Sequence, residues 1–280
     1  MIPMWDPETK PAPLRFGLGR ILLALIRAIF LGSVVFGGLV VLLLLRLVER
    51  PLYGLRRPVT PYITQAVCRM AFEILGIAFS TSGTAMQHPG AVVANHVSWL
   101  DIFALNASKR IYFVSKSEVA GWPVIGWLAR ATGTVFIRRN PKHAKLQKAV
   151  FEARLLAGHR LLFFPEGTST DGLRILPFKS TLFAAFFSDS LRRDMYIQPV
   201  TVLYHEPPGQ AADFYGWWGD SPFVHHLLKT LLAPRQGAVE VIYHGPVKVD
   251  DYPNRKALAA ETERRVRAGH RLLEKSPQNR

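Results

Sequence analysis

An uncharged apolar run near the start of the chain limits where this protein can reside. Ala28–Leu45 is a stretch of 18 residues without a charged side chain, a length that favours a membrane helix. A buried helix of a soluble protein rarely has an apolar surface on every side. A secretory signal would end in small residues, but this run is followed by Arg46, Glu49, Arg50 and Pro51. The run therefore predicts a helix that anchors the chain in a bilayer.

Basic residues flank the apolar run on both sides, so the positive-inside rule does not choose an orientation. The cations before and after it are Lys10, Arg15, Arg20, Arg27, Arg46, Arg50, Arg56 and Arg57. One arrangement keeps both flanks in the cytoplasm, with a re-entrant or in-plane element paired with the second apolar stretch at residues 59–79. We expect residues 1–17 to form a flexible proline-rich tail and residues 18–80 to form the anchor region.

Composition indicates a folded chain with a preference for anionic partners. Hydrophobic residues make up 49% and charged residues 20% of the 280 residues, which excludes disorder for most of the chain. The net charge of +15 suits anionic lipid, phosphorylated ligands or nucleic acid. Cys68 is the single cysteine, so the chain has no internal disulfide and no cysteine-rich metal cluster.

From residue 90 onward, short apolar runs alternate with helical patterns. We expect strands at residues 91–94, 111–115, 134–138, 160–164, 197–203 and 238–244. Helices are expected from near Ser98 and at residues 123–130, 140–157, 180–188, 222–233 and 254–274. The order predicts an α/β fold, in which helices flank a largely parallel sheet. We assign residues 81–250 to this domain and residues 251–280 to a basic C-terminal helix.

The first of these strands leads directly into the sequence NHVSWLD, residues 95–101. A histidine at a strand end can reach a ligand, because ligands of such sheets bind at the carboxyl ends of the strands. His96 is suited to accept a proton near neutral pH, and Asp101 could orient its ring. Ser98 and Asp101 also fit a helix-capping pattern, in which His96 would be an ordinary loop residue. The seven residues alone leave both interpretations open.

A second polar cluster, FPEGT at residues 164–168, follows another apolar strand. Pro165 cannot continue a strand ladder, and Gly167 allows the backbone to approach a ligand closely. Glu166 and Thr168 add a carboxylate and a hydroxyl group. Strand ends of a parallel sheet meet at one edge, so we expect this cluster to lie near His96.

Four blocks in this order resemble the glycerolipid acyltransferase family, which includes bacterial 1-acylglycerol-3-phosphate acyltransferases. NHVSWLD resembles the family's NHxSxxD block, and FPEGT resembles its second block. Between them, Lys116-Ser-Glu118, Pro123, Gly126, Gly133 and Ile137-Arg138 are similar to a further stretch. IQPVTV around Pro199 resembles the closing block. The resemblance covers about residues 90–205.

The resemblance implies a lysolipid O-acyltransferase in which His96 removes the acceptor's hydroxyl proton and Asp101 orients His96. The acyl donor would be a thioester of acyl-carrier protein or coenzyme A, and no cofactor or metal is expected. Residues implied to bind the acceptor are Glu166, Gly167, Thr168, Arg138 and Lys116. Supporting roles fall to Asn95, Ser98, Pro165 and Pro199. The chain has no G-x-S-x-G nucleophile motif, which fits direct transfer.

The expected acceptor is 1-acyl-sn-glycerol 3-phosphate, and the product would be phosphatidic acid. Ser169 stands where phosphatidate-forming members usually have arginine, and LPFKS (176–180) and Trp218-Gly219-Asp220 resemble the lyso-ornithine lipid branch. Lyso-ornithine lipid is therefore the alternative acceptor. We expect the enzyme to act at the cytoplasmic face of the inner membrane, with the bilayer rather than nucleic acid as partner. A lipid hydrolase and a non-catalytic membrane adaptor are the alternatives from other functional classes.

Overall fold

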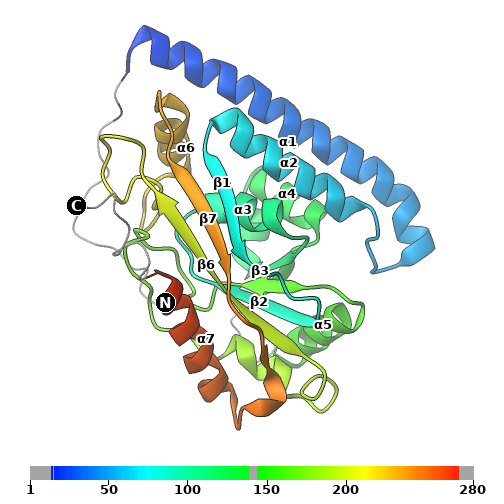
Figure 1. Ribbon diagram of the computed structural model, residues 1–280. Helices are drawn as coiled ribbons and strands as arrows, with labels where there is room; N and C mark the ends of the chain where they lie inside the picture. Colours follow the sequence, from blue (N-terminus) through cyan, green and yellow to red (C-terminus); the bar gives the residue numbers. More distant parts are fainter. Residues whose placement is uncertain (1–13, 15, 139–143, 271–280) are drawn as a thin grey trace.

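The computed structural model describes residue 14, residues 16–138 and residues 144–270 (Figure 1). Its strands are β1 (Ala78–Gly83), β2 (Gly90–Ala94), β3 (Tyr112–Lys116), β4 (Val135–Ile137), β5 (Leu161–Phe163), β6 (Tyr196–His205), β7 (Ala238–Tyr243) and β8 (Val247–Lys248). Its α-helices are α1 (Leu18–Tyr53), α2 (Thr60–Leu75), α3 (Leu100–Ser108), α4 (Ile125–Thr132), α5 (Ala144–Leu156), α6 (Phe223–Leu232) and α7 (Arg255–His270). The short 3₁₀ helices among the described residues are η1 (Ser117–Gly121), η3 (Leu182–Phe187) and η4 (Val249–Asp251).

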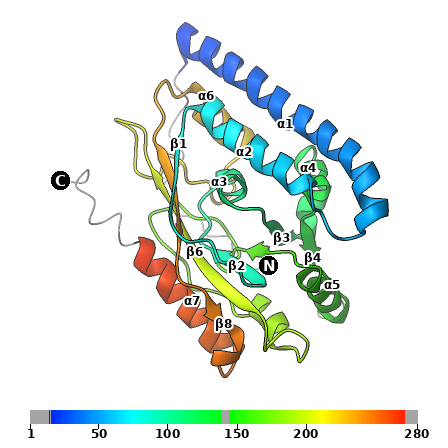
Figure 2. The ribbon, with the colours of Figure 1, turned by 45° about the vertical axis from the view of Figure 1, so that its right-hand side comes forward.

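The strands form one sheet in the order β1-β7-β6-β2-β5-β3-β4, and β8 pairs with β6. All neighbouring pairs are parallel except β6 with β7 and β6 with β8. The prediction of a largely parallel α/β sheet is confirmed. Helices α2 and α3 lie on one side of the sheet, and α7 lies on the other (Figures 1 and 2).

Strand β2 shows how the sequence produces two cores. Successive side chains of a strand point to opposite faces of the sheet. Val92 and Ala94 belong to the core that includes residues of α2, α3 and α6. Ala91 and Val93 belong to the other core, with residues of α5, η3 and α7. The continuous run of buried residues in β2 therefore reflects helices packed on both faces.

Helix α1 lies along the domain instead of projecting from it, as Figures 1 and 2 show. Near its start, Arg27 Nη1 donates to the carbonyl oxygens of Leu231 (3.1 Å) and Ala233 (2.6 Å) at the end of α6. Near its end, Glu49 Oε1 accepts hydrogen bonds from the backbone N–H groups of Val59 and Thr60 at the start of α2. Both ends of α1 are thus attached to the folded domain.

The outward surface of α1 remains apolar. Helix α1 is long and apolar enough to cross a membrane, by length and composition alone. Its large exposed apolar residues include Leu18, Leu22, Leu25, Ile29, Phe30, Phe36, Val40, Leu44, Leu47, Val48 and Leu52. The predicted apolar helix is present, and its exposed side has no protein partner among the described residues.

Strand β1 is the main element that the sequence analysis did not predict. Its side chains are mostly exposed, with no run of apolar residues, and its place is set by parallel pairing with β7. The helix expected at residues 180–188 is the 3₁₀ helix η3. Parts of other predictions lie outside the described residues: most of the tail, Lys10, Arg15, the helix start at Asn140-Pro141 and residues 271–280.

Candidate active site

Four adjacent parallel strands each end at a residue that the sequence analysis singled out. Their order across the sheet is β2, β5, β3 and β4. His96 follows β2, Glu166 follows β5, Lys116 ends β3 and Arg138 follows β4. The carboxyl ends of parallel strands share one edge of the sheet, so the topology gathers these residues along that edge.

His96 and Asp101 form the contact that the resemblance implied. His96 Nδ1 lies 2.7 Å from Asp101 Oδ2, and the Asp101 side chain is fully buried. Because a carboxylate accepts hydrogen bonds, Nδ1 carries the proton and Nε2 keeps its lone pair. The His96 side chain is 20% exposed, so its ring is not closed off from solvent. An imidazole held in this tautomer can take a proton from an alcohol.

Asp101 also caps the loop, so both interpretations of NHVSWLD hold together. Its Oδ2 accepts hydrogen bonds from the backbone N–H groups of Val97 (2.7 Å) and Ser98 (3.1 Å). Its Oδ1 accepts a hydrogen bond from the hydroxyl group of Tyr204 at 2.9 Å. The loop backbone and Tyr204 therefore fix the carboxylate that in turn fixes the His96 ring.

Aromatic stacking also holds the His96 ring. The rings of His96 and Phe164 are 4.0 Å apart between centroids and 9° from parallel. The backbone N–H of Thr170 donates to the His96 carbonyl oxygen at 3.0 Å. The segment after β5 therefore contacts both the ring and the backbone of His96.

Glu166 holds the loop that contains His96 through two hydrogen bonds to the backbone. Its Oε1 accepts from the N–H of His96, and its Oε2 accepts from the N–H of Leu176, both at 2.7 Å. The residue is 1% exposed, and this burial raises the pKa of Glu166 to about 8. Both carboxyl oxygens are thus engaged with the protein's own backbone, which supports a positioning role.

The turn after Glu166 depends on glycine. Gly167 has a φ of +78°, a left-handed conformation that residues with a side chain rarely adopt. Thr168 is partly exposed next to it. This turn presents Thr168 at the same edge as His96.

The four supporting residues are distributed around the strand ends. The Asn95 side chain pairs with β6, donating to the Val202 carbonyl oxygen and accepting from its N–H. Ser98 is buried at the start of α3, and Pro165 accepts a hydrogen bond from the N–H of Lys179. Pro199 lies in β6, in register with Val93 of β2. They connect β2, β5 and β6 behind the site.

The two expected headgroup ligands, Lys116 and Arg138, are exposed at the ends of β3 and β4. Lys116 is in register with Ile137, the residue before Arg138. The topology therefore places these two cations on neighbouring strands, farther along the edge than Glu166. Their binding role stays a prediction.

Sequence reasoning missed Tyr204 and Phe164 as contributors to the site. Tyr204 lies 103 positions from Asp101, and only the pairing of β2 with β6 brings them together. Phe164 is the first residue of FPEGT, and its place at a strand end was the signal that its ring could contact His96. Among the described residues, no group of three or more His, Cys, Asp or Glu side chains could hold a metal ion.

Comparisons with known proteins agree with this geometry. A family model described as Acyltransferase matches residues 77–203, which include every block of the site. A relative from Rhodobacter capsulatus, named lyso-ornithine lipid O-acyltransferase, is 57% identical over 270 residues, covering 95% of this chain and 97% of the relative. This chain belongs to the lysolipid acyltransferase family. The suspected family and the acyltransferase activity are thereby confirmed.

Two further similar proteins share less of their sequence with this chain. A 1-acyl-sn-glycerol-3-phosphate acyltransferase from Neisseria gonorrhoeae is 37% identical over 149 residues, covering 52% of this chain and 56% of the relative. The solved structure of the 1-acyl-sn-glycerophosphate acyltransferase PlsC from Thermotoga maritima shares the fold, with a TM-score of 0.65 and 20% identity. That match covers 92% of this chain and 97% of the other. The protein is an acyltransferase that acts on lysolipids.

Proposed function

We propose that this enzyme transfers a fatty acyl group from a thioester donor to the hydroxyl group of lyso-ornithine lipid. The observation that carries the proposal is the 57% identity, over nearly the whole chain, to a relative named for that acceptor. The relative named for 1-acylglycerol 3-phosphate matches only about half of the chain. The alternative of the sequence analysis thus has better support than its first expectation, lysophosphatidate.

Ser169 supports the same acceptor. An arginine at this position would offer a two-pronged contact to a phosphate group, and serine cannot. Ornithine carries an amino group and a carboxylate instead of a phosphate, so it does not require that contact. Lysophosphatidate remains the second candidate, because Lys116 and Arg138 provide cations at the same edge of the sheet.

The geometry supports a direct transfer. His96 Nε2 takes the proton of the acceptor hydroxyl group, and Asp101 stabilises the imidazolium that forms. The acceptor oxygen then forms a bond to the thioester carbonyl carbon, and the carbon–sulfur bond breaks. The departing thiolate of acyl-carrier protein or coenzyme A receives the proton from His96. This sequence returns His96 to its starting state.

We further propose that α1 lies in the plane of the membrane. Arg27 and Glu49, both attached to the domain, are 22 residues apart, or about 33 Å along a helix. That length exceeds the apolar core of a bilayer, about 30 Å. A crossing helix would therefore pull α2 and α6 into the bilayer with it. An in-plane helix buries its exposed apolar side while the active site stays at the cytoplasmic face of the inner membrane, where soluble acyl thioesters are available.

Acyl transfer is tested with the full chain in non-ionic detergent. Lyso-ornithine lipid, lysophosphatidate or no acceptor is supplied with acyl-carrier-protein or coenzyme A thioesters, and thiol release and lipid products are measured. We expect turnover that requires lyso-ornithine lipid and that His96→Ala nearly abolishes. His88→Ala is the matched control, because His88 is exposed near the opposite end of β2.

The outcomes separate the functional classes. Turnover with lysophosphatidate alone would refute the proposed acceptor. Thiol release without any acceptor would indicate a hydrolase. Full activity of folded His96→Ala would refute the mechanism. Absence of all turnover with every acceptor and donor would favour a non-catalytic adaptor.

The in-plane arrangement is tested by labelling single cysteines in intact cells. Cys68 is buried and can remain in place, and the new cysteines are Met4→Cys in the tail and Lys256→Cys on α7. We expect both to be protected from a membrane-impermeant thiol reagent until the inner membrane is opened. Labelling of the tail alone before opening would show that α1 crosses the bilayer.

A further inference from the structure

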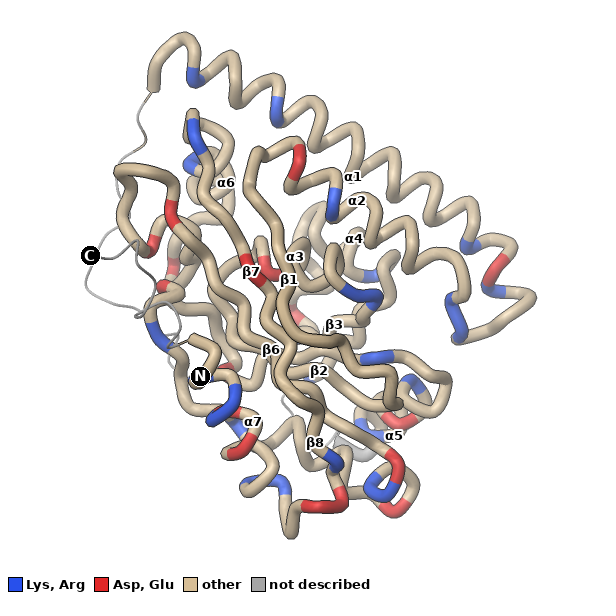
Figure 3. Tube along the Cα trace, in the orientation of Figure 1, with Lys and Arg blue, Asp and Glu red and all other residues tan. Residues whose placement is uncertain are grey.

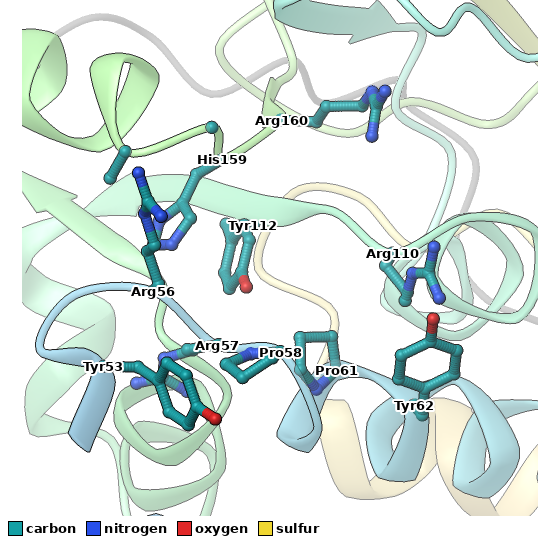
Figure 4. Close-up of a pocket in the computed structure, with 12 residues that line it drawn as sticks. Tyr53, Arg56, Arg57, Pro58, Pro61, Tyr62, Arg110, Tyr112, His159 and Arg160 are labelled. Carbon is teal, nitrogen blue, oxygen red and sulfur yellow. The ribbon is translucent and has the colours of Figure 1, made fainter. Parts of the chain in front are cut away.

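A basic cavity lies at the edge of the sheet opposite the active site. It has a volume of about 420 Å³ and is formed where the connection between α1 and α2 meets the starts of β3 and β5. Its lining includes Arg56, Arg57, Arg110, Tyr112, His159 and Arg160. In Figure 4, Arg56 and His159 lie on one side of the cavity and Arg110 and Arg160 on the other, with Tyr112 between them. The cavity is large enough for a small ligand.

The positive charge of this cavity is not balanced by acidic side chains. No Asp or Glu is among the described residues that line it. Burial lowers the pKa of Arg57, with a further contribution from Arg46, and burial and Arg110 lower the pKa of Arg160. Among the described residues, the exposed Arg56 side chain has no hydrogen bond or ion pair. An anion in the cavity would relieve this repulsion.

The acidic side chain that influences Arg57 already has hydrogen-bond partners. The Glu49 carboxylate affects the pKa of Arg57, but its oxygens accept hydrogen bonds from Arg46, Val59 and Thr60. It caps the start of α2 and does not line the cavity. The described residues therefore leave the positive charge of the cavity uncompensated.

Two buried donors in the cavity wall lack hydrogen-bond partners. They are Nε2 of His159, which is 5% exposed, and Nε of Arg160. His159 Nδ1 accepts a hydrogen bond from Arg154 Nε at 2.6 Å, so the proton of the ring is on Nε2. Burial, with Arg154 and Arg57, lowers the pKa of His159 to about 4, so the ring is neutral at pH 7. The Leu55 carbonyl oxygen lies close enough to affect this pKa but not in hydrogen-bonding geometry.

The mouth of the cavity adjoins the apolar surface of the α1–α2 connection. Leu52, Tyr53, Leu55 and Val59 are all about half exposed or more there. An anion delivered at this position is at the level of lipid headgroups if α1 lies in the membrane plane. The active site lies at the other edge, about 16 Å away along a five-residue strand such as β3. The reacting hydroxyl and thioester groups meet at His96 and therefore do not occupy the cavity.

We propose that this cavity binds the headgroup phosphate of an anionic phospholipid of the bilayer, separately from the acylation site. The guanidinium groups of Arg56, Arg110 and Arg160 lie around the phosphate and balance its charge. The bound lipid fixes the α1–α2 connection to the membrane surface. The inference depends on the in-plane placement proposed above, because only that placement brings the cavity to the headgroups.

Binding of water-soluble short-chain lipids to the full chain in non-ionic detergent tests this site. Dihexanoyl phosphatidylglycerol, dihexanoyl phosphatidylcholine and inorganic phosphate are titrated by calorimetry. We expect one site for phosphatidylglycerol and weaker binding of the other two, since choline adds a cation and inorganic phosphate lacks acyl chains to contact the apolar side chains at the mouth of the cavity. Arg110→Gln with Arg160→Gln should weaken phosphatidylglycerol binding about thirtyfold.

The matched control removes two exposed arginines at a distance, Arg193→Gln with Arg255→Gln. Equal weakening by both double variants would reduce the effect to net charge and overturn the site. Equal affinity for inorganic phosphate or for phosphatidylcholine would overturn the assignment to an anionic lipid. If the first double variant fails to fold, Arg56→Gln replaces it, with an expected loss of about fivefold, and unchanged affinity overturns the proposal. Binding requires neither turnover nor a bilayer, so failure of acyl transfer or of membrane placement is observed independently.

Discussion

Replacement of Glu166 by glutamine distinguishes two roles for this residue: positioning the His96 loop and binding the acceptor. Each carboxyl oxygen of Glu166 accepts a hydrogen bond from one backbone N–H at 2.7 Å, from His96 and from Leu176. The glutamine amide accepts on one side only, so its NH₂ group faces one of these N–H groups. An unpaired buried donor costs about 1–3 kcal/mol of unfolding free energy. Displacement of the His96 loop lowers kcat by about tenfold to a hundredfold, while the acceptor KM stays unchanged.

The same substitution changes the pH dependence of stability. The ordinary pKa of Glu166 is 4.5, and burial raises it to about 8 in the folded protein. Between these two values the unfolded chain releases the proton while the folded chain retains it. The stabilising contribution is therefore complete below pH 4.5 and is lost as the pH rises to about 8. Glutamine does not titrate, so the stability of Glu166→Gln lacks this pH dependence. We therefore expect the difference in Tm between the wild type and Glu166→Gln to decrease from pH 5 to pH 8.

The assay combines steady-state kinetics with thermal unfolding in detergent at pH 5, 6.5 and 8. Glu73→Gln is the matched control, because Glu73 is an exposed carboxylate on α2. A raised acceptor KM with unchanged kcat would refute the positioning role and restore the acceptor-binding role. A Tm difference between wild type and Glu166→Gln that is constant with pH would refute the argument from its pKa.

Three further predictions concern the same domain. Asp101→Asn should lower kcat by about 10³–10⁴-fold, because an amide does not hold His96 in the required tautomer. The rate of thiol release measures kcat, and a loss of less than tenfold would contradict the role of Asp101. Tyr204→Phe removes one hydrogen-bond donor to the buried Asp101 carboxylate and should lower the unfolding free energy by about 1.5–3 kcal/mol. The loss of kcat should be smaller than for Asp101→Asn. Denaturant titration measures the stability and steady-state kinetics measure kcat; an unchanged denaturation midpoint would argue against this contact. Burial raises the pKa of the Cys68 thiol to about 12, so a maleimide should label it only after unfolding; rapid labelling of the native protein would contradict its packing.

The sequence was informative wherever an apolar strand ended in polar residues. The runs before His96 and Glu166 predicted β2 and β5, and parallel topology then predicted that the two residues share an edge. Strand β1 could not be predicted in this way, because its exposed, mixed residues carry no apolar run and its conformation comes from pairing with β7. Tertiary context decided that element.

The direction of side chains was a second feature that the sequence could not predict. The residues of FPEGT indicated a functional segment, but no pattern shows whether Glu166 points to a ligand or to the backbone of His96. Tyr204 reaches Asp101 only because β6 extends beyond its register with β2. The basic cavity likewise draws Arg56, Arg110 and Arg160 from three separate segments. Each of these contacts depends on the assembled sheet.

The attachment of Arg27 to the end of α6 has a consequence for protein synthesis. The two acceptor carbonyl groups follow Arg27 by 204 and 206 positions in the sequence. Helix α1 therefore leaves the ribosome long before these carbonyl groups are synthesised. At about 5–20 residues per second, the interval is roughly 10–40 s. During that interval the nascent helix exposes apolar side chains on every side, and the lipid surface is the partner at hand. With α1 in the membrane as proposed, targeting to the membrane precedes folding of the acyltransferase domain, which is then completed on a chain already held there.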